Sequence, residues 1–324
     1  IKKDEITDSR FLIEYDGNPE YSLIPDIGDP QMLFLANNVS KMKRNTELGS
    51  RIIEVHNGSS LFTGNAGSGS SNLRRFIIEN DFLEAIVALP ENMFYNTGIA
   101  TYLWVVTNKK DIKRKGKVQL IDATSLKSSL RKNIGEKNCE ITPEIRKRIL
   151  KFYMEYTDAD PAYSKVFDNE EFGYYSVEIQ RPLRLRVDCS DDKLETLKDG
   201  SKDEALYELL REYAESVNEV VFLDYNKFVE HLEGVANKSS LKLTAKRKKA
   251  IRDYLAETDE TAAPVLTSKG ELEPDKTLKD TEQIPLMYDG GIQGFLNKEI
   301  KPYVPDAWIN EDTASVGYEL TFTK

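Results

Sequence analysis

The chain has 324 residues, of which 40% are hydrophobic and 31% are charged, a composition typical of folded domains and not of disordered segments. It contains no apolar run of about 18 residues, and its charged first residues lack the apolar core of a signal peptide. Two cysteines and two histidines exclude a disulfide framework and supply no zinc spacing, which favours the reducing cytoplasm. A net charge of −10 argues against a surface that wraps DNA throughout, but it permits a local basic patch or a basic partner.

The first predicted element is a helix over residues 30–43, with Asp29 as N-cap, because apolar residues recur there at helical spacing. A short strand over Arg51–Val55 follows, then a loop over residues 57–70. A second helix is predicted over Asn72–Glu79, capped by one of the two serines before it.

Two nearly continuous apolar segments, Phe82–Leu89 and Thr101–Thr107, predict buried strands, and Lys117–Asp122 predicts a third. The link between the first two, residues 90–100, is too short for a helical crossover. We therefore expect them to be antiparallel neighbours, in one sheet with Arg51–Val55. Buried strands separated by helices indicate an α/β fold.

Beyond Ser125 the polar residues up to Cys139 predict a loop or linker, and Pro143–Tyr156 predicts a helix with Thr142 at its N-cap. A smaller α+β region is expected after residue 158. Its predicted strands are Phe167–Tyr175 and Val177–Val187, and its predicted helices are Asp203–Val217, Tyr225–Val235 and Leu243–Ala256. This organisation gives three parts: residues 1–125, a linker and helix over 126–158, and an α+β region over 159–324.

A glycine-rich segment, Gly64-Asn-Ala-Gly67-Ser-Gly69-Ser, lies between a predicted strand and a predicted helix, where backbone amides can bind anions. Its spacing fits neither the dinucleotide fingerprint nor the P-loop, which needs a lysine. The segment is either a ligand loop or a plain flexible connection.

The loop Pro90-Glu-Asn-Met-Phe94-Tyr95-Asn96-Thr97-Gly98-Ile99 places two aromatic rings and an amide at the end of a strand. Loops at strand ends are common binding sites. Aromatic rings beside amides suit stacking on an extruded nucleobase and hydrogen bonding to it. The alternative is a hairpin whose rings cap the edge of the sheet.

For the other polar residues, a structural role is one of the interpretations that the sequence allows. One predicted amphipathic helix carries six cations, which form either a solvated charged face or a phosphate-binding site. They are Lys242, Lys246, Arg247, Lys248, Lys249 and Arg252. The arginines of Arg181-Pro-Leu-Arg184-Leu-Arg186 are expected on one strand face, against acidic neighbours or DNA. His56 has no partner at a catalytic spacing. We interpret Asn18-Pro19-Glu20-Tyr21 as a turn.

Three sequence segments, taken together, resemble the sequence of the modification (M) subunit of type I restriction-modification systems over about a hundred residues. They are Asn57-Gly-Ser-Ser-Leu-Phe-Thr-Gly64-Asn-Ala-Gly67-Ser-Gly69, Asn72-Leu-Arg74-Arg75-Phe-Ile-Ile-Glu79 through Pro90, and Phe94-Tyr-Asn-Thr-Gly98-Ile-Ala-Thr-Tyr-Leu-Trp104. Arg181-Pro-Leu-Arg184-Leu-Arg186 and Pro302-Tyr-Val-Pro-Asp306-Ala-Trp308 support the resemblance further along the chain.

The resemblance implies a DNA adenine-N6 methyltransferase that uses S-adenosylmethionine and works with a specificity (S) subunit and a restriction (R) subunit. It implies the second half of a Rossmann-like methyltransferase sheet, followed by the smaller α+β domain. The family's glycine-rich donor motif and its Asn-Pro-Pro-Phe/Tyr motif do not occur in this sequence. We therefore expect a portion of an M subunit that is inactive alone and does not bind the methyl donor.

The resemblance also directs the site predictions. We expect Phe94, Tyr95, Asn96 and Asn57 to form the pocket for the target base. The candidates for the DNA cleft are Gly64, Gly67, Gly69, Arg74 and Arg75. No catalytic, cofactor-binding or metal-binding residue is assigned in this chain. A different hypothesis is a non-catalytic scaffold for the specificity subunit. A nucleotide hydrolase using the glycine-rich loop is disfavoured because the loop has no lysine.

Overall fold

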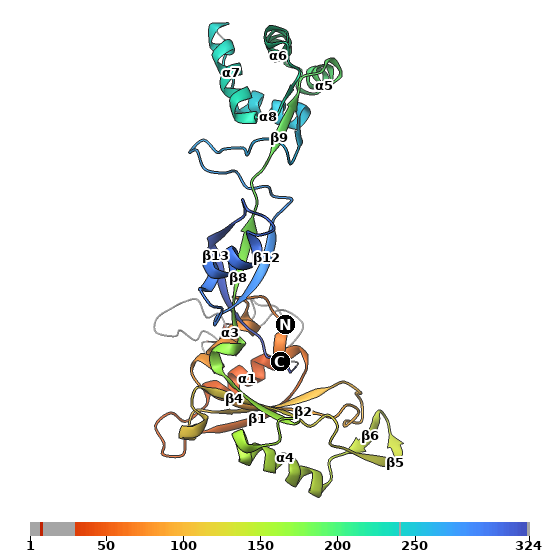
Figure 1. Cartoon of the computed structure of the whole chain (residues 1–324). Coiled ribbons are helices and arrows are strands. Elements are labelled where there is room, and N and C mark those ends of the chain that lie inside the picture. Colours follow the sequence, from red (N-terminus) through yellow and green to blue (C-terminus); the bar gives the residue numbers. More distant parts are fainter. Residues whose placement is uncertain (1–6, 9–29, 240, 323–324) are drawn as a thin grey trace. The chain divides into compact units, whose positions relative to one another are not determined.

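The computed structural model describes residues 7–8, 30–239 and 241–322 (Figure 1). The chain divides into two compact units: Ile1–Val177, Glu282–Phe295 and Asp312–Lys324 form the first unit, and Glu178–Thr281 and Leu296–Glu311 form the second. Both predicted boundaries, at residues 125 and 158, fall within the first unit. Within the described ranges, no helix combines the length and the apolar character needed to cross a membrane.

The first unit is built on a five-stranded sheet with the order β1-β3-β2-β4-β7. β3 is antiparallel to both β1 and β2, β4 is parallel to β2, and β7 is antiparallel to β4. The predicted antiparallel pairing and the shared sheet are therefore confirmed. The strands are β1 (Arg51–Asn57), β2 (Leu83–Leu89), β3 (Thr101–Thr107), β4 (Lys117–Asp122) and β7 (Ser164–Asp168).

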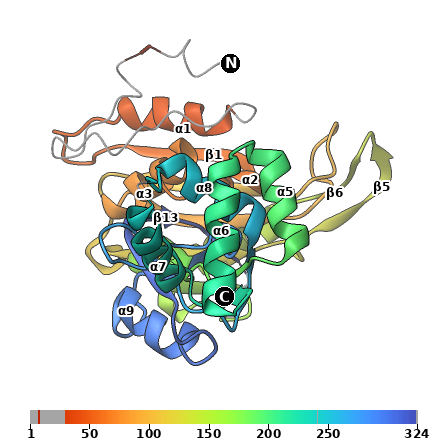
Figure 2. The same ribbon diagram turned by 90° about the horizontal axis from the view of Figure 1, so that it is seen from above.

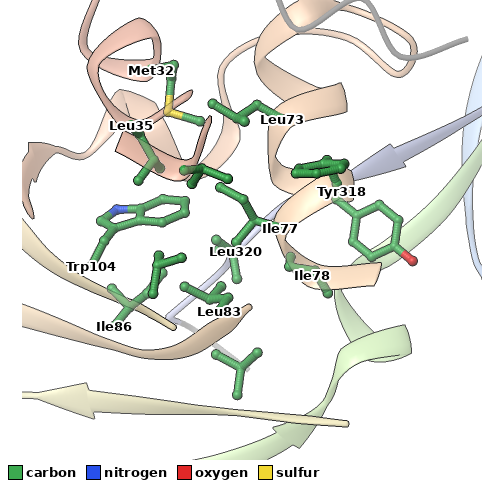
Figure 3. Packing of buried hydrophobic residues seen from close by; sticks show 14 of the residues in the cluster. Met32, Leu35, Leu73, Ile77, Ile78, Leu83, Ile86, Trp104, Tyr318 and Leu320 are labelled. Atoms are coloured by element: carbon green, nitrogen blue, oxygen red, sulfur yellow. The ribbon is translucent and has the colours of Figure 1, made fainter. Parts of the chain in front are cut away.

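One face of this sheet is covered by α1 (Gln31–Ser40) and α3 (Gly69–Glu79), which Figure 1 shows on the side opposite to α4. Alternate strand residues point into this core, and Trp104 is fully buried there. Figure 3 shows the Trp104 ring packed among side chains of both helices and of the C-terminal segment. This core is formed by Met32, Leu35, Leu73, Ile77, Ile78, Leu83, Ile86, Trp104, Tyr318 and Leu320, among others.

The other face is covered in part by α4 (Pro143–Glu155). As predicted, Thr142 is the N-cap, and its side chain accepts a hydrogen bond from the Ile145 amide at 3.4 Å. Phe152 packs from α4 onto Val87 and Ile121 of the sheet. Because α4 lies over β2 and β4, the same face of β1 is left partly open, and Ile53 is 60% exposed.

Three predictions of local structure are wrong. Residues 126–139 form no linker but an antiparallel hairpin of β5 (Ser128–Ile134) and β6 (Lys137–Glu140). The predicted loop after β1 contains a short helix, α2 (Ser59–Phe62). Helix α3 begins at Gly69 after Ser68, and not at residue 72.

The first helix begins at Gln31, with Pro30 at its N-cap position and no side-chain cap. The predicted N-cap Asp29 and the predicted turn at residues 18–21 lie outside the described residues.

The second unit packs helices around a three-stranded sheet with the order β10-β9-β11. The predicted helices are confirmed, whereas a helix at residues 191–201 was missed and the strands are shorter than predicted. The elements are β9 (Leu185–Asp188), α5 (Asp191–Ser201), α6 (Glu204–Val217), β10 (Val221–Phe222), α7 (Tyr225–Lys238), α8 (Ala245–Leu255) and β11 (Ala256–Thr258).

A further three-stranded sheet has the order β12-β8-β13. Its strands are β12 (Asp280–Pro285), β8 (Gly173–Gln180) and β13 (Trp308–Tyr318), and α9 (Gly291–Phe295) lies in the chain between β12 and β13. Each strand begins in one unit and ends in the other. This strand β8 replaces the predicted strand over 167–175, because residues 169–172 form a 3₁₀ turn.

Candidate functional site

The carboxyl ends of the parallel strands meet at one end of the first unit's sheet, which we call the loop end. Asn57, the last residue of β1, pairs with Thr101, and Thr101 also pairs with Leu89 at the end of β2. β4 is parallel to β2, so Asp122 lies at the loop end too. In open α/β sheets, ligands bind at this end.

Asn57 is held in place by two polar neighbours at the loop end. Its amide oxygen accepts hydrogen bonds from the Gln31 side-chain nitrogen at 2.8 Å and from the Ser59 backbone amide at 2.9 Å. Its backbone amide donates to the Gln31 side-chain oxygen at 3.0 Å. The Asn57 side chain is therefore oriented by α1 and the start of α2.

The loop between β2 and β3, residues 90–100, presents its rings to solvent. Phe94 is 38% exposed and Tyr95 is 57% exposed, and Asn96 beside them is exposed as well. The loop is closed by a bridge between Phe94 and Thr97 and by a hydrogen bond of 3.3 Å from the Asn92 amide to the Gly98 carbonyl. Neither ring is therefore part of a core.

The β5–β6 hairpin, which the sequence reasoning missed, is bonded to this loop. The Glu136 amide donates to the Tyr95 carbonyl at 2.9 Å, and the Asn138 amide donates to the Asn92 carbonyl at 3.0 Å. Lys137 lies over the Tyr95 ring, 5.3 Å from its centre. A glycine at the start of a two-residue turn, here Gly135, is the sequence signal that could have identified the hairpin.

The glycine-rich segment leads from β1 into α3 at the same end of the sheet. Gly64 and Gly67 have φ angles of +98° and +79°, which only glycine adopts readily, and Gly69 is the first residue of α3. A Cβ added at Gly64 would lie 2.4 Å from the Ser68 hydroxyl oxygen. Ser68 therefore lies directly against Gly64, where a larger side chain would not fit.

The two arginines that follow have different surroundings from each other. Arg74 is fully buried, and it donates to the Tyr318 carbonyl at 2.6 Å and to the Ser60 carbonyl at 3.1 Å. Burial lowers the pKa of Arg74 to about 10. Arg75 forms an ion pair with Glu79, one helical turn away. Arg74 thus joins α3 to the C-terminal segment and has no access to solvent.

A groove of about 740 Å³ lies beside Phe94 on the sheet face that α4 only partly covers. Its floor is apolar and includes Val55, which is 51% exposed, together with Leu89 and Leu103. The cations Arg51, Lys137 and Arg146 line its rim with Glu140. The groove suits a partly apolar occupant.

A buried carboxylate fixes α4 beside this groove. Glu84 is 2% exposed, and its carboxylate lies 2.8 Å from the Arg51 guanidinium and 3.6 Å from that of Arg114. Arg51 also donates to the Tyr153 hydroxyl of α4 at 2.6 Å. Burial, together with the charge of Glu84, raises the pKa of Tyr153, so this phenol stays protonated.

His56 has the structural position that the sequence favoured. It is 3% exposed, its ring lies 3.0 Å from a Glu54 carboxylate oxygen, and its centre lies 5.4 Å from that of Trp104. In the described parts of the chain, no three His, Cys, Asp or Glu side chains are grouped as a metal site. His56 therefore belongs to the packing under the loop end.

In the second unit several basic residues have acidic partners. Arg184 lies 2.7 Å from Asp306, and Arg186 lies 2.8 Å from Glu257, which resolves the alternative for these two arginines in favour of acidic neighbours. On α8, Arg247 pairs with Asp203, Lys248 with Glu233 and Arg252 with Glu273. Hydrogen bonds from Arg186 and Lys193 lower the pKa of Glu257 to about 2.

The comparison with protein families identifies this chain. The family described as N-6 DNA methylase matches residues 20–183, which is half of the 324 residues. The chain belongs to the N-6 DNA methylase family. The match contains the whole five-stranded sheet, the glycine-rich segment and the loop of Phe94 and Tyr95.

Curated relatives are similar over shorter segments. The MjaVIII type I restriction enzyme methylase subunit of Methanocaldococcus jannaschii is 28% identical over 149 residues, 46% of this chain and 25% of the relative. The HindI methylase subunit of Haemophilus influenzae is 39% identical over 69 residues, 20% of this chain and 15% of the relative. The chain thus spans a quarter or less of the length of these relatives.

Among solved structures, a type I restriction-modification methyltransferase subunit from Streptococcus thermophilus matches with a TM-score of 0.38 and 21% identity. The match covers 44% of this chain and 28% of that one.

Proposed function

We propose that this chain is part of the DNA-methylating subunit of a type I restriction-modification system, which transfers a methyl group from S-adenosylmethionine to adenine N6. Membership of the N-6 DNA methylase family and the type I methylase subunits among the relatives support this proposal. The observation that carries it is the exposed aromatic loop at the end of the sheet where ligands of α/β folds bind.

The finer fold proposal is that the sheet forms the second half of a Rossmann-like methyltransferase sheet. β1 and β2 run parallel, with α3 between them in the chain and β3 inserted antiparallel between them in the sheet. Among the described strands, β1 pairs only with β3. We place the first half of the sheet at the outer edge of β1.

The residues at the loop end do not fit the methyl donor. The glycine-rich segment has neither the spacing of a donor motif nor an acidic ribose partner. We therefore place S-adenosylmethionine and the Asn-Pro-Pro motif on parts of the methylase other than these 324 residues, and we derive no methyl-transfer step from this chain.

The target base is the ligand that we propose for the loop. Modification of a base inside a duplex requires its rotation out of the stack, which costs a few kcal/mol. Stacking on an aromatic ring returns about 1 to 3 kcal/mol per base. Phe94 and Tyr95 offer exposed ring surface for this stacking, and the amides of Asn57 and Asn96 can hydrogen-bond to a polar base edge.

Specificity and restriction subunits are the further partners in this proposal, with direct readout of the DNA sequence placed on the specificity subunit. Gly64, Gly67, Gly69 and Arg75 remain candidates for the DNA cleft at the loop end. The role of buried Arg74 is to hold that end of the sheet together.

Steady-state methylation by the assembled methylase containing this chain tests the base pocket. Phe94→Ala and Tyr95→Ala are each expected to lower the rate by up to about a hundredfold, the equivalent of one lost stacking contact of about 1 to 3 kcal/mol. Tyr303→Ala, which removes a ring that is 84% exposed in the second unit, is the matched control. Wild-type rates for both loop variants, with the assembly intact, would show a scaffold in place of a base pocket.

A further inference from the structure

A basic segment in direct contact with the base-pocket loop lies on the hairpin and the helix that follows it. Residues 127–151 contain eight lysines and arginines against three glutamates, in a chain whose net charge is −10. The basic residues are Lys127, Arg131, Lys132, Lys137, Arg146, Lys147, Arg148 and Lys151. A positive segment of this kind on an acidic chain is a local site for a polyanion.

The cations on the outer strand of the hairpin are free. Arg131 and Lys132 on β5 are exposed, and within the ranges that the structure describes neither forms an ion pair with a carboxylate. On α8, Arg247, Lys248 and Arg252 are each paired, whereas the exposed Lys242, Lys246 and Lys249 form no ion pair within the described ranges. The hairpin therefore holds positive charge that nothing within the described chain neutralises.

The shape of the segment suits a nucleic-acid duplex. β5 and β6 pair antiparallel at Ser128↔Glu140, Ser129↔Cys139 and Ile134↔Lys137, with an irregular register between Ser129 and Ile134. Both views show this ribbon extending beyond the end of the sheet (Figure 1 and Figure 2). A two-stranded ribbon fits into the major groove of B-form DNA, and lysine and arginine side chains contact the flanking phosphates.

The ribbon is also joined to the loop of the base pocket. β6 bonds to β5, and the Asn138 amide of β6 bonds to the Asn92 carbonyl. The Glu136 amide in the turn bonds to the Tyr95 carbonyl. Gly135, at the turn, has a φ of +62°, and a Cβ there would lie 2.3 Å from the Tyr95 carbonyl oxygen. The turn therefore fits against the loop only with glycine at this position.

We propose that the hairpin Ser128–Glu140 is a DNA-binding arm, in which Arg131 and Lys132 contact duplex phosphates beside the flipped base. Its backbone contacts with Asn92 and Tyr95 set the position of the two rings. The inference rests on the proposed function for the base-pocket loop. The partner is the phosphate backbone of duplex DNA, which these cations contact whatever the base sequence.

The salt dependence of DNA binding by the 324-residue chain tests the arm directly. Each phosphate contact contributes about 0.9 to the slope of log K against log salt concentration. Arg131→Gln/Lys132→Gln is therefore expected to reduce the slope by about 1.8 on a duplex of about 20 base pairs, an order-of-magnitude estimate from two lost contacts. The control, Lys113→Gln/Lys115→Gln, removes two exposed lysines at the opposite end of the sheet, and its slope should equal that of the unsubstituted chain.

The link to the base pocket is tested with a glycine pair. Gly135→Ala brings a methyl group against the Tyr95 carbonyl. Because the displaced Tyr95 ring would then stack less well on the base, we expect the methylation rate of the assembled enzyme to fall roughly tenfold. Gly116→Ala is its control, because Gly116 has a similar φ of +71° and nothing lies within 4 Å of an added Cβ. The salt slope of Gly135→Ala should be unchanged, because all charges remain.

Two results would overturn the inference. An unchanged slope for Arg131→Gln/Lys132→Gln rules out the phosphate contacts, and loss of specificity-subunit binding in that variant would identify the arm as a protein-docking surface instead. Equal methylation by Gly135→Ala and Gly116→Ala rules out the coupling. If the unsubstituted assembly does not methylate DNA, the proposed function is rejected. The DNA-binding arm is still tested in that case, because the slope measurement does not depend on methylation.

Discussion

The hairpin of the first unit and helix α8 of the second are both basic, but they differ in what surrounds their charges. Residues 242–252 contain six lysines and arginines and no acidic residue, a higher density than that of the hairpin. Three of the six pair with carboxylates of neighbouring elements, whereas Arg131 and Lys132 have no such partner among the described residues. Both segments therefore hold cations without an internal partner, and those of the hairpin differ in that they lie on an element bonded to the loop of Phe94 and Tyr95.

Two arginines beside the glycine-rich segment also differ in their surroundings. Arg74 and Arg75 are adjacent in the sequence, yet one is buried against backbone carbonyls and the other pairs along the helix surface. A buried arginine that satisfies core carbonyls is expected to contribute more to stability than an arginine in an ion pair on a helix. This difference can be tested by substitution.

The largest effect is expected at Arg74. Arg74→Met keeps the apolar stem but leaves the carbonyls of Tyr318 and Ser60 unpaired in the core, which should lower the free energy of unfolding by about 2 to 4 kcal/mol. Urea titration followed by Trp104 fluorescence in a Trp308→Phe background reports on the first unit. Arg75→Gln, which removes the pair with Glu79, should change stability by less than about 1 kcal/mol. Equal effects of the two variants would contradict the structural role of Arg74.

A smaller effect is expected on α8. Arg252 contacts both carboxylate oxygens of Glu273, at 2.7 and 2.8 Å, and lies over the Tyr225 ring at 4.8 Å. Arg252→Gln should therefore destabilise the second unit by about 1 to 2 kcal/mol and leave the salt slope of DNA binding unchanged. Thermal unfolding measured by circular dichroism gives the first quantity, with exposed Lys249→Gln as control. A reduced slope for Arg252→Gln would move the DNA contact to α8.

The sequence was most informative where local rules determine the structure. The short link between Phe82–Leu89 and Thr101–Thr107 leaves only an antiparallel pairing, and Thr142-Pro143 marks the start of α4. Both follow from neighbouring residues alone. The alternation of strand residues between the two sheet faces likewise required no distant contact.

The hairpin and the burial of Arg74 could not be predicted in this way. The strands of the hairpin are polar and largely exposed, so they lack the apolar alternation that indicates a strand, and they are supported by backbone bonds to residues 91–95. Arg74 is buried because Tyr318, 244 positions away, supplies its acceptor. Long-range contacts of this kind leave no local pattern, and the base-pocket assignment itself came from the family resemblance.

Photochemical crosslinking in the assembled methylase tests the central claim most directly. A duplex in which 5-iodouracil replaces the target adenine places a photoreactive base where the flipped nucleotide is held, and such a base attaches to the aromatic ring on which it stacks. We predict attachment at Phe94 or Tyr95, identified by mass spectrometry of the peptide that contains residues 90–100 and abolished by the corresponding alanine variant. Attachment to another segment, such as α8, with residues 90–100 unlabelled, would contradict the assignment of the base pocket to this loop.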